Sequence, residues 1–146
     1  MIQRIQSLYL LLAAAAGAAA LSFNLWKATL TNSAVTYVNA ASNYLLFVLY
    51  IIIILLALVC IFLFKKRKLQ FRLTVFNILF GIAALAYQYL VVQQTANKIS
   101  ANGVSIVSAS YLPASFLPII IIILLFLAAR GIYKDEKLIK SLDRLR

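Results

Sequence analysis

Four apolar stretches without a charged residue constrain this chain more than any other feature. Each is 17 to 21 residues long, and an α-helix needs about 20 residues to cross a hydrocarbon core of about 30 Å. Lipid offers no hydrogen-bond partners, so backbone groups in a membrane must be satisfied within helices or closed barrels. We therefore predict one all-α membrane domain, residues 1–146, built as a bundle of four transmembrane helices. The expected spans are residues 7–26, 44–64, 73–92 and 113–129, followed by a tail, residues 130–146.

The composition excludes a soluble globular protein. Charged residues make up 12% of the chain, well below the roughly 25% typical of soluble domains, and the mean hydropathy is +1.01. The first span also has features of a secretory signal peptide, with a basic start and small residues near Ala20. Its apolar stretch continues to Trp26, however, and is longer than the apolar region of such peptides. We therefore expect this span to remain as an uncleaved helix.

Basic residues are distributed unequally between the two sides of the predicted bundle. Twelve of the fourteen lie before the first span, between the second and third spans, or in the tail, whereas only Lys27 and Lys98 fall in the other two connections. Segments rich in lysine and arginine stay in the cytoplasm. The distribution predicts that both termini are cytoplasmic.

The two connections on the opposite side, residues 27–43 and 93–112, are nearly uncharged and rich in Ser, Thr and Asn. Asn102-Gly103 between β-prone residues is a hairpin signal, and residues 34–38, AVTYV, have the composition of a strand. A small extracytoplasmic β-hairpin and irregular loops are both compatible with these sequences.

Small and polar residues recur on one face of two predicted spans, at helical spacing. The face on the third span consists of Thr74, Asn77, Gly81, Ala84 and Gln88. The face on the first span consists of Ala13, Gly17, Ala20 and Asn24. These faces predict close helix packing with hydrogen bonds between helices, and the alternative is a polar track for a solute. Ion and proton paths usually contain an ionisable residue, and the predicted spans contain no acidic or basic one, which disfavours a coupled transporter.

A basic cluster separates the second and third spans and consists of Lys65, Lys66, Arg67, Lys68 and Arg72. It serves first as a topology signal. It can also attract anionic lipid head groups, by about 1 kcal/mol per charge near the surface, or an acidic partner surface. Binding of nucleic acid is not expected, because the cluster lacks interleaved aromatic residues and a nucleic-acid-binding motif.

The tail predicts an amphipathic helix. Its apolar arc consists of Ile132, Leu138, Ile139, Leu142 and Leu145, with Asp135 also on that side. The basic residues outside the arc include Lys137, Lys140 and Arg144. Such a helix binds either the membrane surface or another protein. Acidic residues favour a protein partner slightly, because a helix that binds only lipid does not need them.

No constellation for catalysis or metal binding is visible in the sequence. The chain has no histidine and one cysteine, Cys60, and its three acids are Asp135, Glu136 and Asp143 in the tail. A nucleophile with a neighbouring base, or a set of metal ligands, cannot be assembled from the usual residue types. We expect no enzymatic activity, no metal site and no cofactor.

The chain starts MIQRIQSLYLLLA and finishes RGIYKDEKLIKSLDRLR. Both ends resemble an uncharacterised family of small four-helix inner-membrane proteins from Bacteroidota, defined as a domain of unknown function. The resemblance covers the whole length and implies a bacterial cytoplasmic membrane and no cleaved signal, but no activity, cofactor or catalytic residue. Because both ends are predicted to be cytoplasmic, we expect them to pack together, with Arg4 pairing with Asp135, Glu136 or Asp143.

Together these observations favour a non-enzymatic accessory or scaffold protein that docks through residues 65–72 and the tail. The expected partners are anionic lipids at the cytoplasmic face, a partner in a membrane complex, or a second copy of the chain. The alternative is a channel or transporter for a small solute or lipid. A water-lined gap between the first and third spans, near Asn24, Asn77 and Gln88, would favour that alternative.

Overall fold

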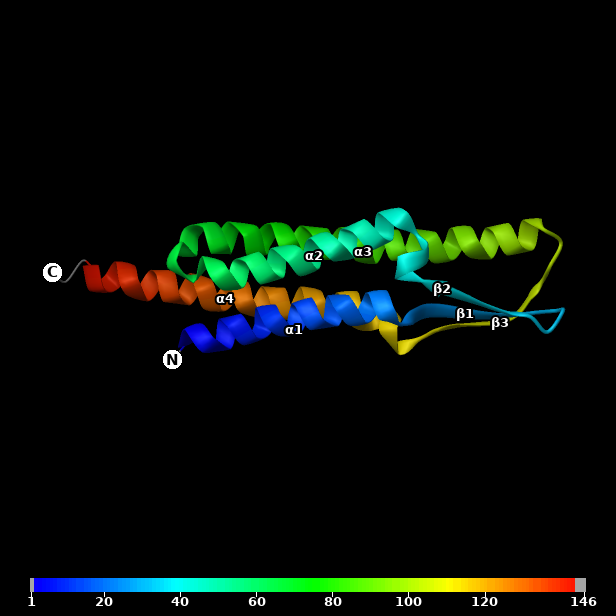
Figure 1. Ribbon diagram of the computed structural model, residues 1–146, viewed down its shortest axis with the longest axis horizontal. Helices are drawn as coiled ribbons and strands as arrows, with labels where there is room; N and C mark the ends of the chain where they lie inside the picture. Colours follow the sequence, from blue (N-terminus) through cyan, green and yellow to red (C-terminus); the bar gives the residue numbers. More distant parts are fainter. Residues whose placement is uncertain (1, 144–146) are drawn as a thin grey trace.

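The computed structural model describes residues 2–143, with side chains for residues 5–64 and 66–138. Four helices form an elongated bundle (Figure 1), namely α1 Ile2–Ser22, α2 Tyr44–Phe62, α3 Arg67–Ala101 and α4 Leu117–Asp143. Helix α1 packs against α2 and α4, and helix α3 packs against the same two helices. In this part of the chain, all four helices are long and apolar enough to cross a membrane. The prediction of four such helices is confirmed.

The bundle is apolar both inside and outside. The largest buried side chains include Leu10, Tyr50, Ile53, Ile121 and Leu125. Each helix also exposes large apolar side chains on its outer surface, among them Leu12, Leu55, Phe76 and Phe126. A helix that is hydrophobic on all sides is typical of a membrane span or of the core of a larger protein.

The connection between α2 and α3 is a tight turn. A single 3-10 turn, Leu63–Lys65, follows α2, and Lys66 alone separates it from α3. Arg67, Lys68 and Arg72 therefore lie on the first two turns of α3, whereas we expected residues 65–72 to form a loop. The reason is that lysine, arginine, leucine and glutamine are good helix formers, and nothing in this segment ends a helix.

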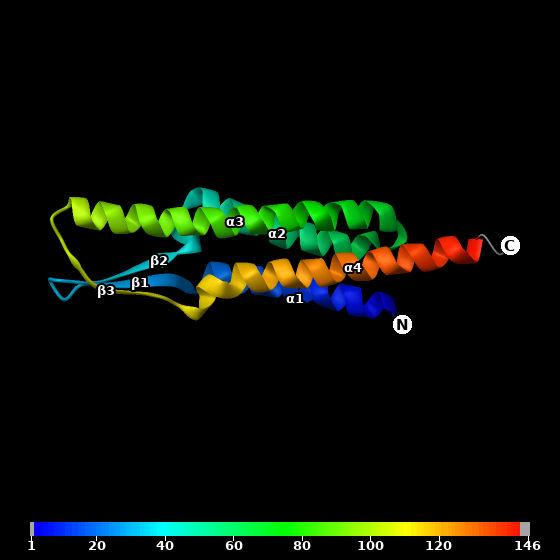
Figure 2. The same ribbon diagram turned by 180° about the vertical axis from the view of Figure 1, so that it is seen from behind.

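Helix α3 is much longer than the predicted span of residues 73–92. Its 35 residues reach about 52 Å at a rise of 1.5 Å per residue, and its C-terminal part extends beyond the other helices and over the strands (Figures 1 and 2). The helix ends at Asn102-Gly103, where Gly103 has a φ of 75° and its N–H donates to the Ser100 carbonyl at 3.1 Å. The hairpin that was one of the two alternatives at this dipeptide does not form there, because a glycine with positive φ also terminates helices.

Three strands form an antiparallel sheet of order β2-β1-β3, which continues from the ends of α1 and α4 (Figure 1). Their bounds are β1 Asn24–Leu30, β2 Val35–Asn39 and β3 Ile106–Tyr111. Of the two alternatives left open for residues 34–38, a strand or an irregular loop, the structure has a strand, β2. The hairpin joins β1 to β2, and its turn is closed by the Leu30 N–H, which donates to the Ala34 carbonyl at 2.9 Å. Trp26 belongs to β1, so the first helix ends earlier than the predicted boundary at residue 26.

A second hydrophobic core lies between the sheet and α3. Trp26 and Ala28 of β1 and Val38 of β2 pack against Val91 and Val92 of α3. Successive residues of a strand point to opposite faces, so the residues between these point away from α3. The β1–β2 part of the sheet therefore has one face covered by α3 and one open face, whereas Ala109 and Tyr111 of β3 are exposed.

Helix α4 continues without a break through the boundary that we expected at residue 129. As far as Asp143, the expected separate tail helix is the last part of α4. This part projects beyond α1 and beyond the turn between α2 and α3 (Figure 1). Both ends of the described chain and that turn lie at one end of the bundle, and the sheet lies at the other.

Candidate functional site

The basic end of the bundle is formed by residues 66–72 and by residues 130–138 of α4. The described cationic side chains there are Lys66, Arg67, Lys68, Arg72, Arg130, Lys134 and Lys137, all exposed except the half-buried Arg67. The rings of Phe71 on α3 and Tyr133 on α4 lie 6.0 Å apart between centroids. This contact joins the two basic segments, which are about 60 residues apart in sequence, into one surface.

Three of the predicted binding residues cannot be placed on this surface. The side chains of Lys65 and Lys140 and the whole of Arg144 lie outside the described part of the chain. The predicted docking surface is therefore represented here by Lys66, Arg67, Lys68, Arg72 and Lys137.

A buried polar contact joins α1 to α4 at the basic end. Gln6 Nε2 donates to Asp135 Oδ2 at 2.7 Å, and Asp135 is only 7% exposed. We expected the two chain ends to pack together through Arg4, whose side chain is outside the described residues, as is that of Asp143. The ends do pack together, but glutamine supplies the described contact. The position of Asp135 on the apolar side of the helical wheel was the signal in the sequence for its burial.

Of the apolar arc predicted for the tail, only Ile132 and Leu138 have described side chains; the side chains of Ile139 and Leu142 and the whole of Leu145 lie outside the described residues. Ile132 is fully buried against the bundle, whereas Leu138 is 54% exposed. The difference arises because Leu138 lies one and a half turns nearer the projecting end of α4. Leu138 is therefore the more exposed of these two apolar side chains, near the projecting end of α4.

The polar face predicted on the third span is buried inside the bundle. Thr74, Asn77, Gly81, Ala84 and Gln88 all lie on the buried side of α3. Asn77 Nδ2 donates to the Ile53 carbonyl of α2 at 3.1 Å, and Asn77 Oδ1 has no hydrogen-bond partner. Sequence reasoning missed Gln70, one turn before this face, whose Nε2 donates to the Cys60 carbonyl at 3.0 Å.

Gln88 links the bundle to the base of the sheet. Its Oε1 accepts from the Tyr50 hydroxyl at 2.9 Å, and its Nε2 donates to the Ser115 carbonyl at 3.1 Å. Ser115 Oγ in turn donates to the Leu25 carbonyl of β1. The network joins α2, α3, the 3-10 helix Pro113–Phe116 and the sheet, which is the packing role predicted for the amide residues.

The small face predicted on the first span is only partly correct. Ala13, Gly17 and Ala20 are buried, and a Cβ added at Gly17 would lie 2.9 Å from Ile54 Cγ1. A Cβ at Gly81 on α3 would lie 3.0 Å from Ile122 Cγ1, so both glycines permit close helix contact. Asn24, which we had assigned to this helical face, is an exposed residue of β1 because the helix ends at Ser22.

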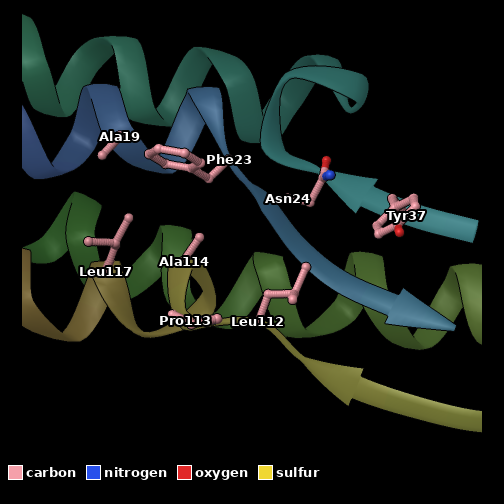
Figure 3. Close-up of a pocket in the computed structure, with 8 residues that line it drawn as sticks. All are labelled: Ala19, Phe23, Asn24, Tyr37, Leu112, Pro113, Ala114 and Leu117. Atoms are coloured by element: carbon pink, nitrogen blue, oxygen red, sulfur yellow. The ribbon is translucent and has the colours of Figure 1, made fainter.

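A pocket lies where α1 and α4 meet the sheet (Figure 3), and we call it the sheet-side pocket. Its volume is about 510 Å³. The side chains around it are Ala19 and Phe23 of α1, Asn24 and Tyr37 of the sheet, and Leu112, Pro113, Ala114 and Leu117 before and in α4. The pocket is apolar on the helix side and has Asn24 and Tyr37 on the sheet side. No signal in the sequence indicated it, because its walls come from three separate segments.

The described residues contain no group of three or more His, Cys, Asp or Glu side chains that could hold a metal ion. Cys60 is buried, with Thr74 Oγ1 donating to its Sγ at 3.7 Å. The two candidate surfaces of the molecule are therefore the basic end and the sheet-side pocket, which lie at opposite ends of the bundle.

Comparisons with known proteins bear on this arrangement only at the level of family. Searches of curated proteins and of solved structures found no match. The family model described as "Domain of unknown function (DUF4293)" matches residues 2–145, which include all four helices, the sheet and both candidate surfaces. The chain belongs to the DUF4293 family.

Proposed function

We propose that this protein is a non-enzymatic docking subunit of a bacterial cytoplasmic membrane, with four spans and both termini in the cytoplasm. Its basic end binds a partner protein with an acidic surface. One observation carries this proposal: α4 continues unbroken from the apolar bundle to an exposed, basic end that projects beyond the other helices (Figure 1).

The direction of α4 favours a protein partner over the membrane surface. Its 27 residues reach about 40 Å, which exceeds the hydrocarbon core of about 30 Å. A surface-bound amphipathic helix lies in the plane of the interface, whereas an unbroken α4 keeps the direction of its span. Leu138 then lies about 31 Å from the start of α4, at the edge of the core, and the part of α4 that follows it is held away from lipid, where a protein can contact it.

The contact between Gln6 and Asp135 supports docking by fixing the base of the projecting segment. A buried carboxylate that accepts a hydrogen bond from α1 holds α4 in one position relative to the bundle. Segments that are already ordered lose less conformational entropy on binding. The charge of the basic end adds specificity for acidic surfaces and accelerates encounter with them.

The alternative of a channel or transporter has less support. Asn77 and Gln88 are engaged with neighbouring helices, and Asn24 lies outside the helical bundle on β1. The three residues therefore do not line a common path between α1 and α3. Anionic lipid at the cytoplasmic face and a second copy of the chain remain the other candidate partners of the basic end.

The membrane orientation is tested with reporter insertions at two turns. A reporter in the turn of residues 31–34 is expected to be active outside the cytoplasm, and one at Lys66 is expected to be active inside. Both turns are exposed and lie at opposite ends of the bundle (Figure 1), so neither insertion interrupts a helix. External activity at Lys66 would overturn the orientation.

The docking role is tested by native purification from cells that express the tagged protein at its chromosomal level. The chain cut after Lys137 loses the projecting segment but keeps Asp135 and its contact with Gln6. A cut after Ala129 is unsuitable, because it also removes the buried Ile132. The point variant Leu138→Ser is the second test, and Lys98→Gln at the sheet end is the matched control.

We expect a stoichiometric partner that is present with the wild type and with Lys98→Gln and is lost with the cut chain. Leu138→Ser is expected to reduce its recovery. The purified partner must then bind the purified wild-type protein and bind the cut chain more weakly. A protein that purifies alone, or with the same companions in all four samples, would contradict the docking role.

A further inference from the structure

The sheet-side pocket and the open face of the sheet together have the chemistry of a binding site for one anionic phospholipid. This surface lies at the opposite end from the basic end, so the inference is independent of the docking role. It rests on the proposed membrane insertion, which the reporter insertions test separately.

The apolar part of the site is the pocket itself. Ala19 and Phe23 at the end of α1 lie on one side of it, and Leu117 and Ala114 lie on the opposite side (Figure 3). Its volume of about 510 Å³ lies within the range of about 300 to 1,000 Å³ for small-molecule sites. Phe23 is 62% exposed, so the pocket is continuous with the apolar outer surface of the bundle. An acyl chain can therefore enter it from the side.

The polar part of the site is the open face of the sheet. Lys27 of β1 is paired directly with Tyr37 of β2 and with Ser110 of β3, and directly opposed residues of antiparallel strands share a face. Trp26 and Ala28 on either side of Lys27 point towards α3, so Lys27 points away from it. Because Tyr37 also lines the pocket, the lysine lies beside the pocket on a surface rich in hydroxyl groups.

The order of these features matches a lipid in its leaflet. The apolar pocket lies at the ends of the helices, where the proposed insertion places the edge of the hydrocarbon core. Tyr37 and Lys27 follow it along the sheet, where the head groups of that leaflet would lie. The chain has three acids, Asp135, Glu136 and Asp143, and all are at the far end of α4, so nothing acidic opposes an anionic head group.

We propose that the sheet-side pocket holds one acyl chain of an anionic glycerophospholipid from the leaflet that borders the sheet. Asn24 and Tyr37 contact its ester region, and Lys27 pairs with its phosphate. The single cation makes the site selective for an anionic over a zwitterionic head group, and the pocket holds the chain regardless of the head group.

The test uses Trp26, the one tryptophan of the chain, which adjoins the site along β1. The full-length protein is reconstituted in vesicles that contain increasing fractions of phosphatidylglycerol or phosphatidylcholine with brominated acyl chains, which quench tryptophan fluorescence. Lipid that merely surrounds the protein quenches the tryptophan to the same extent whether it is phosphatidylglycerol or phosphatidylcholine. A selective site is expected to saturate at a several-fold lower fraction of phosphatidylglycerol.

Two variants separate the head-group contact from the pocket. Lys27→Gln is expected to lower the preference for phosphatidylglycerol by about fivefold, the effect of one charge near a membrane surface. Its control is Lys98→Gln, which removes a cation from α3 and is expected to change nothing. Ala19→Phe places a ring in the pocket and is expected to abolish saturation with both lipids. Its control, Ala15→Phe, adds the same ring on an exposed position of α1.

Native mass spectrometry of the same proteins gives an independent measurement. The wild type, Lys98→Gln and Ala15→Phe are expected to carry one phosphatidylglycerol, and Ala19→Phe is expected to carry none. Unchanged thermal unfolding of Ala19→Phe excludes misfolding as the reason. Equal quenching by both lipids in the wild type, or a bound lipid that survives Ala19→Phe, would overturn the proposal. A pocket that is filled by a peptide segment or by a second copy of the chain would also overturn it, because the two lipids would then quench the tryptophan equally.

Discussion

The sheet end of this protein is closed by segments that are far apart in sequence, whereas the basic end is formed by helices that continue past the bundle. At the sheet end, β1 pairs with β3 about 80 residues away in sequence, and α3 covers the sheet. At the basic end, a buried hydrogen bond joins α1 to α4 and a ring contact joins α3 to α4. The sheet end is therefore shaped by long-range strand pairing, whereas the basic end is distinguished by its exposed cations.

The largest effect is expected from removing the tryptophan that joins the sheet to α3. Trp26→Ala is expected to lower the free energy of unfolding by about 3–5 kcal/mol, the usual cost of truncating a buried aromatic residue. The measurement is denaturant unfolding in mixed micelles, combined with hydrogen exchange. Exchange should accelerate in β1 and stay unchanged around Gln6, because the two ends share no contacts.

The control is Tyr37→Ala, which removes an aromatic side chain from the open face of the same sheet, where Tyr37 is 51% exposed. A much smaller loss is expected there. Equal losses from the two variants would mean that α3 does not cover the sheet.

The next effect is expected at the basic end. Gln6→Ala removes the donor to a buried carboxylate and is expected to cost about 1.5–3 kcal/mol, the range for hydrogen bonds to charged groups. A double-mutant cycle with Asp135→Ala measures the coupling of the pair, and Leu8→Ala on the exposed side of α1 is the control. Additive losses in the cycle would show that the two side chains do not interact.

A smaller effect is expected at the end of α3. Gly103→Ala forces a residue with a Cβ into a positive φ and is expected to cost about 1–2 kcal/mol. No atom lies within 4 Å of the added Cβ, so this cost comes from the backbone alone. Gly103→Asn is expected to cost less, because asparagine tolerates this conformation. If Gly103→Ala lowers the free energy of unfolding by no more than Gly103→Asn does, residue 103 does not need a positive φ, and the observed helix end is contradicted.

The smallest effect on stability is expected from the cations of the basic end. Replacing Lys66 and Lys137 together with glutamine is expected to change the free energy of unfolding by no more than about 0.5 kcal/mol, as for exposed surface residues. Binding to an acidic partner should weaken in the same variant, and its dependence on salt should decrease. A large decrease in the free energy of unfolding would instead mean that these lysines stabilise the fold.

Much of the candidate docking site could be predicted from the sequence, but its details could not. The basic cluster at residues 65–72 and the tail were recognised from composition, and their placement at one end follows from an even number of helices. Arg4 was expected to pair with one of Asp135, Glu136 and Asp143, and its side chain is outside the described residues. The contact of Asp135 with Gln6 was not expected, because a charge pattern does not encode which side chain meets which. The sheet-side pocket had no sequence signal, since its walls are contributed by segments without a shared motif.

The sequence alone determined the number of long apolar helices, their approximate positions and the asymmetry of charge between the ends. These features are local, because helix length and hydropathy are properties of consecutive residues. Only the tertiary structure decided that Asn102-Gly103 ends a helix, that Asn24 and Trp26 belong to a strand, and that α4 continues past residue 129. The end of α3 is fixed locally by the positive φ of Gly103, whereas the other two involve distant segments: the burial of Trp26 under α3, the pairing of β1 with β3, and the packing of α4 against Gln6. Such contacts can override local propensity, because they bury apolar area and satisfy backbone groups that the local sequence leaves open.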